Sequence, residues 1–145
     1  MHQRGNDIMV TKTQAYQVAL DSLNNVWDTI SDSADIWRES QRLELRQVTV
    51  PVQKAIATAV KVVRQNEKQL AAAETVAQAV LDVIAARLDA FGKTLSMEAA
   101  SILSAEELIK VWRRSVLKIL QDVAKQSPDI KKLGAYTALM DRLAA

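Results

Sequence analysis

Four acidic residues come closest to forming a chemical site in this sequence. They are Asp28, Asp32, Asp35 and Glu39, and their steps of four, three and four residues place them on one face of a helix. Carboxylate oxygens are the ligands that Ca²⁺ and Mg²⁺ prefer. A single straight helix, however, presents these side chains in a row and cannot wrap them around one ion. We therefore interpret them as an acidic strip that faces solvent or a partner, and we expect no metal or other cofactor.

Residues that usually carry catalysis are scarce. The one histidine is His2, near the end of the chain, where catalytic geometry is rarely held. Proton transfer near neutral pH most often uses a histidine, and a nucleophile normally needs a base beside it. There is no cysteine for thiolate chemistry, and three scattered glycines cannot form a phosphate-binding loop or an EF-hand. We expect that the protein is not an enzyme.

Basic residues form two rows at helical spacing. The first basic row has three lysines one heptad apart with an arginine beside them, and the second has three cations at steps of four. Outward helix faces are often charged simply for solubility, but this does not explain why acidic and basic residues are separated. The first basic row is Lys54, Lys61, Arg64 and Lys68, and the second basic row is Lys110, Arg114 and Lys118.

Two functional interpretations account for the separated charges. In the first, the acidic strip of one copy contacts the first basic row of another, since electrostatic matching sets register and orientation. In the second, the lysines of the first basic row and the whole second basic row contact phosphates. Lys54 to Lys68 would cover roughly 21 Å of helix, and a duplex carries one phosphate charge per ~1.7 Å. No base-reading motif accompanies the rows, so such binding would be independent of sequence.

Two long heptad patterns predict the helices that hold these rows. The first predicted helix runs from Lys12 to Gln47, and the second from Thr49 to Gly92. Pro51 would lie in the first turn of the second helix, and the glycine would cap its end. About forty residues of helix would span roughly 60 Å, so the partners of this helix must be long as well. The short connection favours an antiparallel hairpin.

Shorter helices are predicted for the rest of the chain. One runs from Ser96 to Leu103, and the next from Ala105 to about Lys125 with Ser104 as its cap. A last helix is predicted to begin with Ser127 as its cap and Pro128 in its first turn. The final two helices together are about as long as one long helix, so they could cover the hairpin.

These patterns predict an all-α fold. The predicted architecture is an elongated antiparallel helical hairpin extended to a four-helix bundle with coiled-coil-like packing. We expect a single helical-bundle domain over residues 12–145, preceded by a flexible arm over residues 1–11.

The segment from Leu70 to Phe91 is apolar at sixteen of twenty-two positions, well beyond one stripe. A helix that is apolar on most sides is buried on most sides. The other helices of the chain could cover this segment, and so could a second copy. The segment is therefore the main reason to expect self-association.

The function predicted from these features is that of a non-enzymatic structural or assembly protein that associates with itself or with a helical partner. An alternative is a coat or nucleoid-type subunit that binds nucleic-acid backbones, and a lower-ranked one is an amphipathic protein that binds lipid surfaces. No run approaches the ~18 to 20 apolar residues of a membrane span, and no signal peptide is recognisable. We expect the protein in the cytoplasm or within an assembled particle.

Overall fold

A computed structural model of the chain describes residues 10–40, 44–70, 75–98 and 104–145. Within these ranges the protein is all-α, as predicted, and has no β-strand. None of the helices in these ranges is both long and apolar enough to cross a membrane. In chain order the elements are α2 (Lys12–Ser40), α3 (Leu45–Gln69), α4 (Thr75–Glu98), α5 (Ala105–Gln126), the 3₁₀ helix η2 (Pro128–Lys132) and α6 (Gly134–Ala144).

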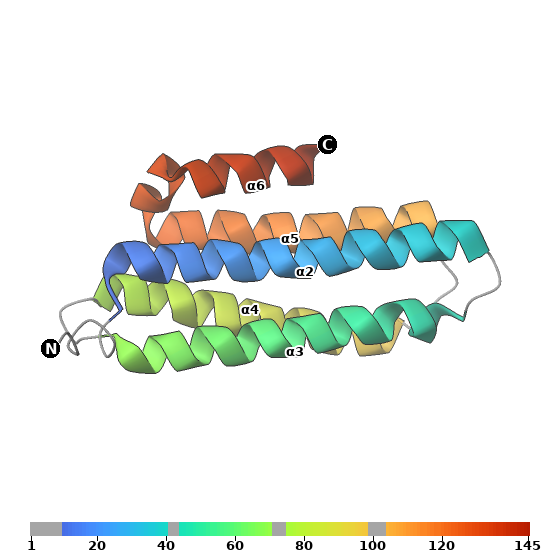
Figure 1. Cartoon of the computed structure of the whole chain (residues 1–145), viewed down its shortest axis with the longest axis horizontal. Coiled ribbons are helices and arrows are strands. Elements are labelled where there is room, and N and C mark those ends of the chain that lie inside the picture. Colours follow the sequence, from blue (N-terminus) through green and yellow to red (C-terminus); the bar gives the residue numbers. More distant parts are fainter. Residues whose placement is uncertain (1–9, 41–43, 71–74, 99–103) are drawn as a thin grey trace, which may run out of the picture.

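The four long helices lie lengthwise, and successive helices run in opposite directions (Figure 1). Both α2 and α4 pack against α3 and α5, and they also pack against each other. Helix α6 lies outside this group and packs against α2 and α5. The helices of one chain therefore cover each other along most of their length.

The prediction of one continuous helix from Thr49 to Gly92 is wrong. Helix α3 ends at Gln69, and α4 begins at Thr75 and runs back along α3 (Figure 1). At the end of α3, Leu70 has an extended backbone and pairs in an isolated bridge with Val10. The alanine-rich connection favours helix locally, but turning back buries the apolar sides of α3 and α4 against each other, and burial of that size outweighs local propensity.

The predicted boundary between the first two helices is also wrong. Helix α3 begins at Leu45, so Pro51 lies inside the helix rather than in its first turn. The start is fixed earlier, where the side-chain oxygen of Gln47 accepts a hydrogen bond of 2.9 Å from the backbone N–H of Glu44. The early start also places Val48, which is buried, inside α3.

Gly92 does not cap a helix, in contrast to the prediction, because α4 continues to Glu98. A Cβ atom at this position would lie 3.4 Å from Cγ2 of Ile56, so the glycine permits α3 and α4 to approach closely. The predicted helix from Ser96 to Leu103 begins inside α4, and its remaining residues, 99–103, lie outside the described residues.

The third main helix is confirmed. Helix α5 spans Ala105–Gln126, and the Ser104 hydroxyl accepts a hydrogen bond of 3.2 Å from the backbone N–H of Glu107. The last predicted helix begins instead as the short η2, followed by α6. The hydroxyl of Ser127 is hydrogen-bonded to the Tyr16 hydroxyl, which attaches the start of η2 to α2.

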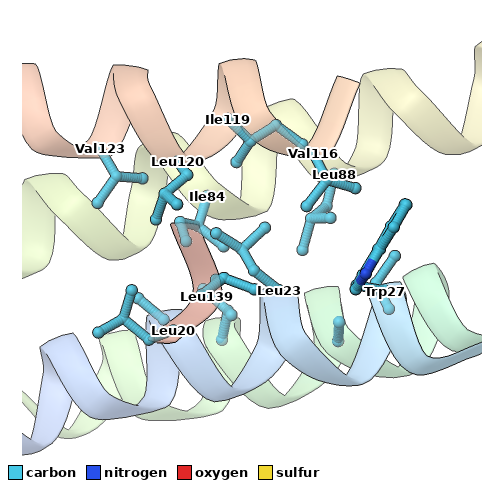
Figure 2. Close-up of a cluster of buried hydrophobic side chains, with 14 of the residues drawn as sticks. Leu20, Leu23, Trp27, Ile84, Leu88, Val116, Ile119, Leu120, Val123 and Leu139 are labelled. Carbon is cyan, nitrogen blue, oxygen red and sulfur yellow. The ribbon is translucent and has the colours of Figure 1, made fainter. Parts of the chain in front are cut away.

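One contiguous core runs through the protein, built from aliphatic and aromatic side chains of every helix. Figure 2 shows its middle section, where residues of α2, α4, α5 and α6 point toward one another. The expected flexible arm lies mostly outside the described residues, and its tenth residue, Val10, joins this core at 9% exposure. The buried residues labelled in Figure 2 are Leu20, Leu23, Trp27, Ile84, Leu88, Val116, Ile119, Leu120, Val123 and Leu139.

Candidate functional site

The acidic strip lies on the outward face of α2, and all four of its carboxylates are exposed. Two of them are held by arginines. Arg142 of α6 contacts Asp28 at 2.6 Å, and Arg38 contacts Asp35 at 3.1 Å. Among the described residues, Asp32 has no ion-pair partner. The strip is therefore partly engaged within the chain and partly free for a partner.

The arginine pairs also show how the strip differs from a metal site. Asp28 and Asp35 bind guanidinium groups that come from different helices, so their carboxylates do not converge on a common point. In the part of the chain that the structure describes, no group of three or more acidic or histidine side chains is placed to hold a metal ion.

Arg38 makes a contact that the sequence patterns did not indicate. Its Nε and Nη2 atoms donate to the two carboxylate oxygens of Glu106 at 2.7 and 3.1 Å, which joins α2 to α5. The hydrogen bonds from Arg38 lower the pKa of Glu106, and the same hydrogen bonds raise the pKa of Arg38. The two residues are 68 positions apart, so no local spacing could have revealed the pair.

The first basic row divides into two parts in the structure. Lys54, Lys61 and Lys68 are exposed on α3, and none has an ion-pair partner among the described residues. Arg64 instead binds Asp82 of α4 at 2.6 Å and Glu67 at 2.8 Å. Its hydrogen bond to Asp82 raises the pKa of Arg64. Arg64 thus links α3 to α4, and the three lysines remain exposed and could contact a partner.

The structure does not join the acidic strip to the first basic row within one chain. The two rows lie on neighbouring helices, α2 and α3, but no ion pair links them in the described ranges. Both are exposed on the outside of the protein. If the two rows meet, they must do so between molecules.

The second basic row lies on the exposed face of α5. Lys110, Arg114 and Lys118 are all exposed, and no ion pair engages them in the described part of the chain. Helices α3 and α5 lie on opposite sides of α2 and α4 (Figure 1). The two basic rows therefore do not form one continuous surface for a single stretch of nucleic acid.

A row of small apolar residues remains uncovered on α4. Its members follow each other at steps of three, four, three and four, and all are exposed except the third, which is half-buried. The first, Val76, is 45% exposed. The other apolar side chains of α4, such as Ile84 and Leu88, are fully buried by the chain itself. We call these residues the α4 row: Val76, Ala79, Val83, Ala86 and Ala90.

A cleft of about 280 Å³ lies between α4 and α5, with Phe91 in its lining and Arg87 beside Asp122 at 3.2 Å. The two hydroxyls that line it, those of Thr94 and Ser115, donate to backbone carbonyls of their own helices. Neither hydroxyl is paired with a base, so the cleft offers no activated nucleophile.

The exposed rows are thus features of this structure that could contact a partner. Comparisons of the chain with protein-family models, with curated proteins and with solved structures find no match in any of the three.

Proposed function

We propose that this chain is a non-enzymatic helical assembly protein, which acts by packing against copies of itself or against a helical partner. The observation that carries the proposal is the α4 row, an apolar surface at heptad spacing whose members are exposed except for the half-buried Val83. Because α4 packs against α2, α3 and α5, most apolar residues between Thr75 and Phe91 are buried by the chain itself. The α4 row is the part of the apolar segment that remains open.

The spacing and size of the row suit contact with another helix. Steps of three and four keep the residues on one seam, as in helices that pack over several turns. Alanines at alternate positions would let a partner helix approach closely, and the valines would fill the space between the alanines. The proposal includes the finer architecture, in which α2 to α5 form a four-helix bundle with coiled-coil-like packing that presents straight outward rows.

Charges beside the α4 row favour one orientation of a second copy. Asp82, which also binds Arg64, precedes Val83, and Arg87, which also binds Asp122, follows Ala86, so opposite charges flank the row five residues apart. Both side chains are more than half exposed, so each can accept a second contact. In two helices that run in the same direction, residues with this relation meet across the seam. In antiparallel helices, aspartate would face aspartate and arginine would face arginine. The flanking charges therefore support a parallel pair of α4 helices.

The proposal is tested by the mass of the protein in solution. We expect the mass measured by light scattering to rise with concentration, and Ala86→Glu to weaken the association by about tenfold or more, since a charge would enter the seam. A matched control is Ala138→Glu on α6, another exposed alanine outside the row. A strict monomer at high concentration, with no partner recovered from its source, would rule the proposal out.

A second candidate function rests on α5. The second basic row continues to Lys125, so four exposed cations without ion-pair partners in the described ranges follow this helix. Such a row supports binding of nucleic-acid backbones, as in a coat or nucleoid-type subunit. Filter binding with unrelated DNA and RNA should then show retention that falls steeply with salt and that Arg114→Gln weakens. An absence of retention at low salt would exclude this function.

Binding to a lipid surface is the lowest-ranked function. The α4 row is rich in alanine and has acidic residues beside it, whereas helices that bind anionic membranes usually pair large apolar side chains with basic ones. Flotation with anionic vesicles tests this function directly.

A further inference from the structure

The outward sides of α2 and α3 carry opposite charges, most of which are not used within the chain. On α2, Asp32 and Glu39 have no ion-pair partner among the described residues, and Asp21 accepts one hydrogen bond of 2.9 Å from Gln17. On α3, Lys54 has no such partner either. Exposed charges of opposite sign on two neighbouring helices form a surface that is complementary to itself.

The acidic residues of α2 and the lysines of α3 also lie at the same levels along the helix axes. Helices α2 and α3 are antiparallel, and a backbone bridge before the start of α2 aligns them at one end. Counted from that bridge, Asp21 lies level with Lys61, and Asp28 with Lys54, each within about two residues or ~3 Å of helical rise. Asp21 and Asp28 are one heptad apart, and so are Lys54 and Lys61, so the two matched pairs follow each other along the face.

The same face also carries exposed apolar side chains and is large enough for a partner. It carries Ile36 on α2 at 55% exposure and Val62 on α3 at 39%, two of the four large hydrophobic residues exposed in the described chain. Helix α3 is about 38 Å long, and two packed helices are together ~20 Å wide. A face of this size approaches the ~800 Å² that each partner contributes to a standard interface.

We propose that, within the assembly proposed above, this α2–α3 face binds the same face of a second copy about a two-fold axis parallel to the helices. That rotation keeps each residue at its own height and places α2 over α3 of the second copy. Asp21 then meets Lys61 of the second copy, and Asp28, which also holds Arg142 and is 52% exposed, meets its Lys54. A two-fold axis perpendicular to the helices and lying in the interface would place α2 over α2, with acid against acid, so the charges select the parallel axis.

The proposal has a consequence for the assembly as a whole. The α4 row and the α2–α3 face lie on different sides of the protein, because α4 packs on the inner sides of both α2 and α3. A chain with two separate two-fold interfaces does not close into a dimer, and copies add one after another in a row. Blocking either interface should leave a dimer, and blocking both should leave a monomer.

The test uses the full chain carrying Ala86→Glu, in which only the α2–α3 face remains to associate. An acid-reversed variant adds Asp21→Lys, and leaves Asp28 in place because it holds Arg142. A base-reversed variant adds Lys61→Glu, and leaves Lys54 in place because it faces Asp28. Helical circular dichroism and the thermal midpoint confirm that each variant is folded.

We expect sedimentation to give a dimer for the Ala86→Glu chain at about 50 mM salt, and a weaker one at ~1 M, since salt screens exposed charges. Each reversed variant alone should weaken dimerisation about tenfold or more, because like charges then face each other. A one-to-one mixture of the two reversed variants should restore the dimer, since each row of one meets the opposite charge on the other.

The outcomes separate this inference from the proposed function. If the unaltered chain associates but the Ala86→Glu chain is a monomer, the α2–α3 interface is wrong and the proposed function stands. Reversed variants that dimerise normally, or a mixture that fails to recover, would also overturn the interface alone. A monomeric unaltered chain with no partner would overturn both.

Discussion

Helices α3 and α4 both bury apolar residues at steps of three and four, but they differ in their packing partners and in the residues on their outward sides. Helix α3 packs mainly against α2 and α4, and its outward side carries lysines. Helix α4 packs against α2, α3 and α5, and its outward side carries the small residues of the α4 row. The comparison teaches that periodicity identifies the buried stripe of each helix, but that the opposite side can be charged, as in α3, or apolar, as in α4.

The largest expected difference between the two helices concerns a buried and an exposed valine. Val80 of α4 is fully buried, and Val62 of α3 is 39% exposed. We expect Val80→Ala to lower the free energy of unfolding by about 1.5–3 kcal/mol, and Val62→Ala to change it by less than about 0.5 kcal/mol. Urea unfolding followed by circular dichroism measures both values. Equal losses would contradict the difference in burial between the two valines.

The contact between the two helices at Gly92 can be tested by size. An alanine there would lie in ordinary contact with Ile56, so Gly92→Ala should stabilise the protein by about 0.5–1 kcal/mol through higher helix propensity. Gly92→Leu should instead cost about 1–3 kcal/mol, because the larger side chain forces α3 and α4 apart. Gly134→Ala is the control, since nothing lies within 4 Å of its added Cβ. A neutral leucine variant would show that the helices are not closely packed here.

The ion pair between the two helices should have a smaller effect. Arg64 and Asp82 join α3 to α4 at 2.6 Å, but both side chains are substantially exposed. A double-mutant cycle with Arg64→Ala and Asp82→Ala should give a coupling of about 0.2–1 kcal/mol that falls as salt rises. Lys61→Ala should show no coupling to Asp82→Ala, since no ion pair engages Lys61 among the described residues. A coupling that salt does not change would contradict the assignment of the pair to the surface.

Acid should act on a different contact, the one between Arg38 of α2 and Glu106 of α5. Hydrogen bonds from Arg38 hold the pKa of Glu106 below its ordinary value of 4.5. The stabilisation is therefore present above that value and is lost as the pH falls through the lower pKa of the folded state. The midpoint of denaturant unfolding, measured from pH 7 to pH 3, should decline less below pH 4.5 in Glu106→Gln than in the unaltered protein. An identical decline in the variant and the unaltered protein would show that Glu106 does not contribute to the loss of stability in acid.

Local signals predicted some elements well and others poorly. Helix α5 begins at the predicted cap, Ser104, because a serine before an amphipathic segment satisfies a backbone N–H without help from distant residues. Pro51 and Gly92 misled the prediction because each has more than one use. A proline is tolerated inside a helix whose start is fixed elsewhere, and a glycine can serve close packing as well as a helix end.

The candidate interaction surfaces were predicted to a similar extent. The spacing of the acidic strip placed its carboxylates on one exposed face, as the structure shows. The same kind of spacing grouped Arg64 with the lysines of α3, but Arg64 belongs to an ion pair with Asp82 that exists only because the chain turns back after Gln69. Helical spacing predicts which residues share one face of a helix. The ion-pair partner of each charged residue depends instead on which helices are neighbours in the fold.

The sequence by itself determined that this protein is all-α, which residues of each helix face inward, and where α5 begins, because these properties depend on contacts within a few turns. Only the tertiary structure decided that the central segment forms two antiparallel helices, which of its apolar residues are covered, and which charges remain unpaired. The physical reason is that helix propensity differs by only tenths of a kcal/mol per residue in the alanine-rich connection. Burial of two apolar helix faces against each other contributes far more, and its partners are distant in the chain.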